Sequence, residues 1–111
     1  MELKMEMLNA TIKSAKLLVT EQGFLSVEIQ LQYAVMSQMF GGYVLYLPKS
    51  FKNHEKKSVA GMFIHRCMEL AGVTEWSKMS GRNIRVMASE TSISGIGHII
   101  NDDWFYPEKE F

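Results

Sequence analysis

Nine consecutive residues, Leu25–Tyr33, alternate strictly between apolar and polar side chains. The apolar positions are Leu25, Val27, Ile29, Leu31 and Tyr33, and the polar ones are Ser26, Glu28, Gln30 and Gln32. Successive side chains of a strand point to opposite faces, so this pattern predicts a strand with one buried face and one wet face. The other elements are placed around it.

Further strands are predicted on both sides. Residues 9–20 become apolar and lead through a turn at Gly23, which indicates an antiparallel hairpin with the alternating strand. A short strand follows and ends at Pro48, after Gly41–Gly42, which marks a turn or a close backbone approach. A polar loop is expected at residues 49–56.

Residues 57–71 have the apolar spacing of an amphipathic helix, with Ser58 as its N-cap and Gly72 just after its end. A short helical turn is expected from Thr74 to Gly81.

Two more strands, residues 82–88 and 92–100, surround the polar turn 89–92. Gly95 and Gly97 interrupt the second one, which indicates a bulge or space for something that approaches the backbone. The predicted fold is α+β: an antiparallel sheet of about five to six strands, with one main helix and a short second helix on one face. We expect one domain, residues 1–111.

Composition limits the classes of function. The chain has 12 basic and 12 acidic residues, a balance that disfavours DNA or an anionic membrane as a partner and weakly favours a homo-oligomer. A single cysteine, Cys67, suits a reducing cytosol. No signal-peptide core and no run of roughly 18 apolar residues is present, so we expect a cytoplasmic protein.

No catalytic or metal motif is evident. Gly-rich phosphate loops are absent, and His54, His65 and His98 lack metal-ligand spacing. The only two aspartates, Asp102 and Asp103, are adjacent, so on a strand they point to opposite faces and cannot act as an acid/base couple. We expect no enzyme activity, no cofactor and no metal.

The chain does contain the side chains that bind a nucleotide. Arg66, Arg82 and Arg85 can neutralise phosphate, and the two aspartates can accept hydrogen bonds from ribose or base. Rings that look exposed can stack on a base. These rings are Phe40, Tyr43, Trp76 and Trp104. The alternative is structural: the arginines pair with Glu69 and an aspartate, and the tryptophans pack the helix on the sheet.

Three segments, "FGGYVLYLP", "FIHRCMELAGVTEWSKMSGRNIRV" and "GIGHIINDDWF", together resemble a family of small phage-encoded proteins, the Thoeris anti-defence sponges of the first type. The resemblance covers nearly the whole chain. It implies a homo-oligomer, a dimer or a hexamer, in the host cytoplasm. Such a protein sequesters cyclic ADP-ribose-type immune signals, and in some members cyclic oligonucleotides, without cleaving them.

The resemblance also implies a site. One wall would be the strand end Asp102–Trp104, which includes Asp103, completed by another protomer. His98 is also expected to bind the ligand. Backbone amides and a ring would come from Phe40, Gly41 and Tyr43. Trp76 or Trp104 would stack on adenine, and Arg85, with Arg66 or Arg82, would meet the diphosphate; Gly95 and Gly97 would leave room for the ligand. Asp103 departs from the basic residue that many relatives have, which puts the ligand preference in doubt.

Three rival functions stay open. A phage inhibitor that binds a host defence enzyme through its surface would form a stable protein complex and bind no small molecule. An enzyme acting on nucleotides would need a catalytic group that the sequence does not assemble. A nucleic-acid binder is disfavoured by the net charge of zero.

Overall fold

The computed structural model describes residues 5–21, 23, 25–34, 36–44 and 59–110, with the backbone alone at 42–44 and 59. The strands are β1 (Glu6–Val19), β2 (Leu25–Tyr33), β3 (Met36–Val44), β4 (Asn83–Ala88), β5 (Ile93–Gly97) and β6 (Trp104–Phe105). The helices are α1 (Val59–Ala71), the 3-10 turn η1 (Trp76–Lys78) and the short α2 (Pro107–Glu110). An antiparallel six-stranded sheet with one main helix and a short second one confirms the α+β class.

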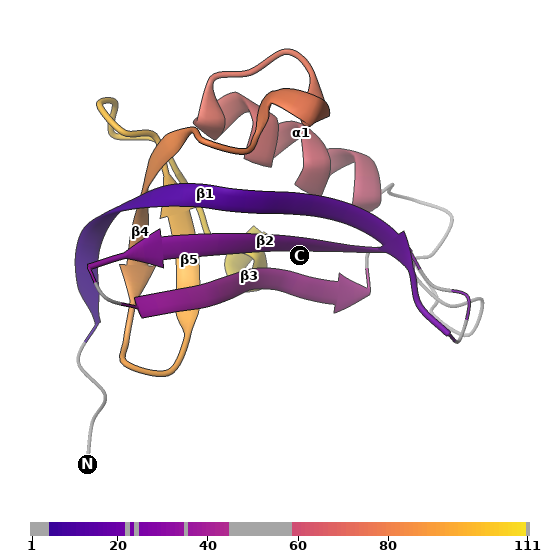
Figure 1. The fold of residues 1–111 in the computed structure, drawn as a ribbon, viewed down its shortest axis with the longest axis horizontal. Helices are drawn as coiled ribbons and strands as arrows, with labels where there is room; N and C mark the ends of the chain where they lie inside the picture. Colours follow the sequence, from indigo (N-terminus) through magenta and orange to yellow (C-terminus); the bar gives the residue numbers. More distant parts are fainter. Residues whose placement is uncertain (1–4, 22, 24, 35, 45–58, 111) are drawn as a thin grey trace.

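Strand β1 organises the sheet, whose order is β3-β2-β1-β4-β5-β6. Its second half, from Thr11 to Val19, pairs with β2, and its first half, from Glu6 to Thr11, pairs with β4. A register shift between Ile12 and Ser14 marks a bulge where the partners change, and a bulge bends a strand. In Figure 1, β1, β2 and β3 run across the front while β4 and β5 cross behind them.

The bend curls the sheet far enough for β3 to contact β5. The Gln38 side chain on β3 donates a hydrogen bond of 2.8 Å to the carbonyl of Glu90, in the β4–β5 turn. Three strands precede α1 and three follow it, and β1 is shared by both halves of the sheet. Sequence periodicity did not predict this curl, because period two is the same in flat and curled sheets.

The inner face of the sheet packs on α1 through Phe63, Cys67 and Leu70, each about 1 % exposed. The rings of Phe40, Phe63 and Phe105 form a cluster with centroids 5.1–6.3 Å apart. Phe40 pairs with Ile29 across β2 and β3 and is 1 % exposed, so the expectation of an exposed ring there is wrong. The Cys67 thiol is buried in this core, and burial raises its pKa to about 12.

The glycines show where local predictions held. Gly23 (φ +88°) lies in the β1–β2 turn and Gly72 (φ +71°) just after α1, both as predicted. Gly41 lies inside β3 and not in a turn; the second option, a close backbone approach, is the one observed.

The helical turn expected from Thr74 to Gly81 is present as the shorter 3-10 turn Trp76–Lys78. Its N-cap residue is Glu75, whose side chain makes no capping hydrogen bond. Pro48, the loop 49–56 and the N-cap Ser58 lie outside the described residues.

Gly41→Ala tests the close approach. Residue 41 has φ +106°, a backbone conformation that strains any residue with a side chain, and a Cβ there would lie only 2.5 Å from the Val27 carbonyl oxygen. Both effects destabilise the variant. We expect the free energy of unfolding to fall by about 2–4 kcal/mol in chemical denaturation. Met39→Gln, at an exposed position of the same strand, is the control and should change stability by less than about 0.5 kcal/mol. Equal stability of the two variants would contradict this explanation.

Candidate functional site

The candidate site lies on the outer face of the sheet, the face turned away from α1 and the aromatic cluster. Strand pairing brings Asn9, Arg85, Gly97 and Trp104 into one row across β1, β4, β5 and β6. A parallel row contains Met7, Met87 and Gly95, and continues with Tyr106 just beyond β6. We call these two rows the outer platform.

Two rings of the outer platform lie flat on glycines. A Cβ on Gly97 would lie 2.7 Å from ring carbons of Trp104, and one on Gly95 would lie 2.5 Å from the ring of Tyr106. The two rings are nearly parallel, with centroids 6.0 Å apart and an interplanar angle of 18°. The expectation that Gly95 and Gly97 leave room for a ligand is therefore wrong, because the protein's own rings occupy that space.

Arg85 reaches toward Trp104 across the bare backbone of Gly97. Its guanidinium carbon lies over the indole, 5.1 Å from the ring centroid. Its Nε donates to the carbonyl of His98 (2.7 Å) and its Nη2 to that of Asn101 (2.6 Å). Among the described residues, Nη1 meets only the Met7 sulfur, at 3.6 Å. Arg85 thus fixes the 98–103 loop and still has N–H groups that can donate to an anion.

Arg66 holds the other side of this loop. From α1, its Nη2 donates to Asp103 Oδ1 and to the carbonyl of Trp104, both at 2.9 Å, and its Nη1 pairs with Glu69. The hydrogen bond from Arg66 lowers the pKa of Asp103, and the same bond raises the pKa of Arg66. This is the structural alternative foreseen from the sequence, in which an arginine pairs with Glu69 and an aspartate.

The 98–103 loop is also closed from within. His98 N donates to the carbonyl of Asp103 (2.9 Å), and His98 Nδ1 accepts the backbone N–H groups of Ile100 and Asn101, each at 3.0 Å. The imidazole is thereby used as a turn-stabilising acceptor. Asp102 is exposed beside it.

The remaining predicted residues lie elsewhere. Arg82 donates to the carbonyl of Ala71, the last residue of α1, and Trp76 donates to the carbonyl of Ala15 on β1. Phe40 is in the core, Gly41 packs on Val27, and the side chain of Tyr43 lies outside the described residues. The structure thus brings together Arg66, Arg85, His98, Asp103 and Trp104, and separates them from Arg82, Trp76 and Phe40.

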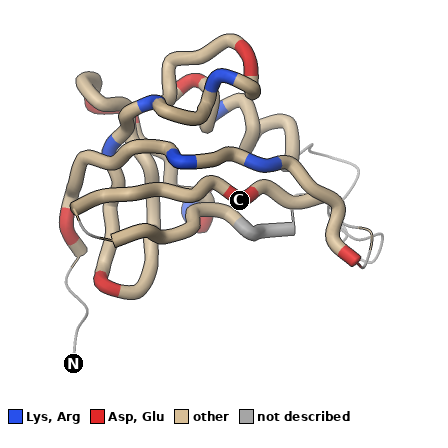
Figure 2. The backbone as a smooth tube through the Cα atoms, in the orientation of Figure 1, with Lys and Arg blue, Asp and Glu red and all other residues tan. Residues whose placement is uncertain are grey.

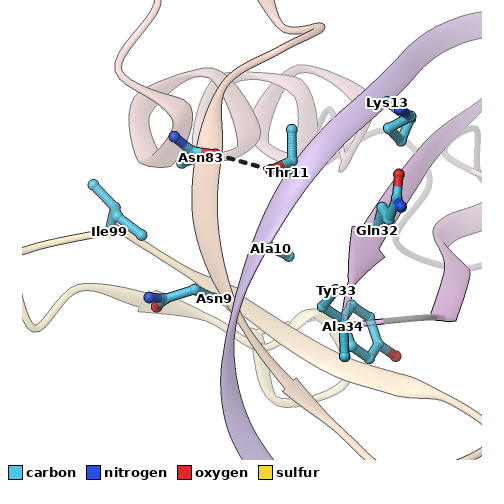
Figure 3. A pocket seen from close by; sticks show the side chains of 9 residues that line it. All are labelled: Asn9, Ala10, Thr11, Lys13, Gln32, Tyr33, Ala34, Asn83 and Ile99. Atoms are coloured by element: carbon cyan, nitrogen blue, oxygen red, sulfur yellow. Dashed lines mark hydrogen bonds between the residues drawn. The ribbon is translucent and has the colours of Figure 1, made fainter.

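A hollow of about 570 Å³ adjoins the outer platform (Figure 3). It lies over the bend of β1, and Ile99 reaches it from the 98–103 loop. Its lining is rich in carboxamides and carries one cation, Lys13. The lining residues are Asn9, Ala10, Thr11, Lys13, Gln32, Tyr33, Ala34, Asn83 and Ile99.

Comparison with known proteins gave no match. No family model, no curated protein and no solved structure is similar to this chain.

Within the described ranges, no three side chains of His, Cys, Asp or Glu gather as metal ligands would. None of the helices there has the length and apolar character needed to cross a bilayer. Lysine and arginine are spread over several elements instead of forming one basic face (Figure 2).

Sequence analysis missed Tyr106, Lys109 and the carboxamides of the hollow. Lys109 Nζ lies 4.8 Å from the Tyr106 ring centroid, so a cation stands at each end of the ring pair. The spacing G-x-G followed by W-x-Y was an available clue, since small residues opposite rings are typical of cross-strand pairs. Nothing in the sequence indicated the carboxamide cluster, because only the register between β1, β2 and β4 brings these side chains together.

The adjacent aspartates provide a matched test of the Arg66 pair. Asp103→Asn should destabilise the protein by up to about 1 kcal/mol at pH 7, since the pair is partly solvated. The folded-state pKa of Asp103 is lowered, so this contribution is full above the unfolded pKa, near 4, and is lost as the pH falls further. Thermal or urea unfolding at pH 7 and pH 3 measures it.

Asp102→Asn is the control, because Asp102 is exposed. It should change the free energy of unfolding by less than about 0.5 kcal/mol at both values of pH. A larger loss for Asp102→Asn than for Asp103→Asn would contradict the assigned pairing.

Proposed function

We propose that this protein binds a nucleotide on its outer platform and holds it without chemical change. The observation that carries the proposal is the pair of rings, Trp104 and Tyr106, which the glycines of β5 support from beneath. Both side chains are half-buried, so each ring still has accessible surface. A base stacked on such a ring gains roughly 1–3 kcal/mol.

Charge at the platform suits an anionic ligand. The Arg85 guanidinium carbon lies over the Trp104 ring, 5.1 Å from its centroid, and its Nη1 has no carboxylate or carbonyl partner among the described residues. Lys109 lies over Tyr106 on a long side chain that can move aside for a base. A phosphate next to a stacked base would therefore meet a fixed guanidinium and a movable ammonium.

Capture without cleavage is supported by how the reactive groups are used. Cys67 is buried and its pKa is raised, so it is a poor nucleophile. His98 Nδ1 already accepts two backbone N–H groups. Asp103 is paired with Arg66. The described platform therefore offers contacts for binding and no assembled nucleophile and base.

The family resemblance makes the proposal more specific. The ligand would be a cyclic nucleotide immune signal, such as a cyclic ADP-ribose isomer, that a phage-encoded sponge sequesters in the host cytoplasm. The protein would act as a homo-oligomer in which another protomer covers the platform. Exposed apolar side chains beside it, Met7 at 55 % and Ile100 at 80 %, support such a contact.

The same exposed side chains favour a second candidate function. Ile100 stands at the tip of a loop that Arg66 and Arg85 hold in place, a rigid apolar projection of the kind that anchors protein–protein contacts. A phage inhibitor of a host defence enzyme would use this surface and would bind no nucleotide.

The chain's two tryptophans allow a direct test. In Trp76→Phe the only indole is Trp104, on the platform; in Trp104→Phe it is Trp76, against β1. Titration with AMP, ADP or a cyclic ADP-ribose isomer should quench emission in the first variant and leave it unchanged in the second. Trp104→Ala should weaken binding roughly tenfold or more, as expected for one lost stacking contact.

Recovery of the ligand tests capture. Nucleotide retained with the protein on a filter should be released intact on heat denaturation. Ligand that returns altered would replace the capture proposal with an enzyme. Quenching confined to Trp76 would place the nucleotide away from the platform and contradict the proposed site. A stable complex with a host protein, with no nucleotide bound by either Trp variant, would support the inhibitor instead.

A further inference from the structure

The hollow beside the outer platform has unused hydrogen-bonding capacity. Asn9, Lys13 and Gln32 line it, and among the described residues none of their side-chain polar groups has a hydrogen-bond or ion-pair partner. Asn83 accepts a hydrogen bond from the Thr11 hydroxyl at its Oδ1 (2.9 Å), which leaves its amide hydrogens to donate. Figure 3 shows these polar side chains around the bend of β1, with Ile99 at one side.

The register makes the hollow and the platform one continuous surface. Gln32, Thr11 and Asn83 form a row across β2, β1 and β4. Asn9 lines the hollow and also pairs directly with Arg85, which belongs to the platform. Neighbouring strands lie about 4.8 Å apart, so roughly 14 Å separates β1 from β6. A ligand stacked on Trp104 would extend over Arg85 into the hollow.

The chemistry of the lining indicates what part of a ligand fits there. Carboxamides and hydroxyls both donate and accept, which matches hydroxyl groups that do the same. One lysine and no arginine line the hollow, so a diphosphate is better served by Arg85 outside it. The hollow also offers no aromatic ring apart from Tyr33, whose hydroxyl points away from it in Figure 3.

We infer that the hollow is a second subsite, which binds an uncharged polyhydroxylated ring, such as the second ribose of an adenine–ribose–diphosphate–ribose ligand. This inference rests on the proposed nucleotide-binding function, and it states which part of the ligand lies on which part of the surface. The base stacks on Trp104 and Tyr106, the phosphates meet Arg85, and the distal sugar hydrogen-bonds Asn9, Gln32 and Asn83. Lys13 at the rim adds a donor for hydroxyl or phosphate oxygen.

The test uses three probes that differ by one group at a time: AMP, ADP and ADP-ribose. Affinity is measured by calorimetry and by Trp104 emission in the Trp76→Phe background. We expect ADP-ribose to bind roughly tenfold more tightly than ADP, the gain from two or three added hydrogen bonds. Asn83→Ala combined with Gln32→Ala should remove that gain and leave ADP affinity within about twofold.

Gln30→Ala is the matched control, because Gln30 is a β2 glutamine outside the hollow. It should leave the ratio of ADP-ribose to ADP affinity unchanged, and thermal melting shows whether each variant is folded. Equal affinity for ADP and ADP-ribose would overturn the subsite while leaving the proposed function standing. Failure of all three probes to bind would overturn both.

A dinucleotide of two adenosines distinguishes a sugar from a base in the hollow. The inference predicts weaker binding of this dinucleotide than of ADP-ribose. Tighter binding of the dinucleotide, sensitive to Asn83→Ala and Gln32→Ala, would overturn the sugar assignment and identify the hollow as a base site.

Discussion

The double pairing of β1 is the constraint on which the rest of the structure depends. Its first half hydrogen-bonds β4 and its second half β2, with a bulge between them. This arrangement curls the sheet, closes the core around α1 and brings β3 to β5. It also places the carboxamides of β1, β2 and β4 around one bend, next to Arg85. The hollow and the outer platform are therefore products of the same bend.

The outer platform depends on two glycines that provide a flat support. With side chains at Gly95 and Gly97, the rings of Trp104 and Tyr106 could not lie on β5, and Arg85 could not reach Trp104. The arginines then fix the strand that carries the rings: Arg66 and Arg85 hold the 98–103 loop through its carbonyls and Asp103. A fold does not itself specify a ligand. Binding at the outer platform is therefore proposed from these groups.

Local patterns predicted much of the fold. The alternation of Leu25–Tyr33, the turn at Gly23 and the helix ending before Gly72 were confirmed because each depends on neighbouring residues. The site was less predictable, because it depends on register and curl. Phe40 was expected to be exposed but faces the core. The sequence did not distinguish the two tryptophans, yet Trp76 lies against β1 and Trp104 lies over Gly97 on the outer platform. The two glycines were recognised as a gap, but the rings that fill it, Trp104 over Gly97 and Tyr106 over Gly95, come from β6 and the residue just beyond it.

The most direct test of the central claim is a two-dimensional ¹H–¹⁵N NMR titration of the unmodified protein with ADP-ribose. The account predicts that the Trp104 indole and the backbone amides of Gly95 and Gly97 shift together with the side-chain amides of Asn83 and Gln32, while the Trp76 indole stays in place. An unchanged Trp104 indole at saturating ligand, or shifts that gather around Trp76, would contradict it.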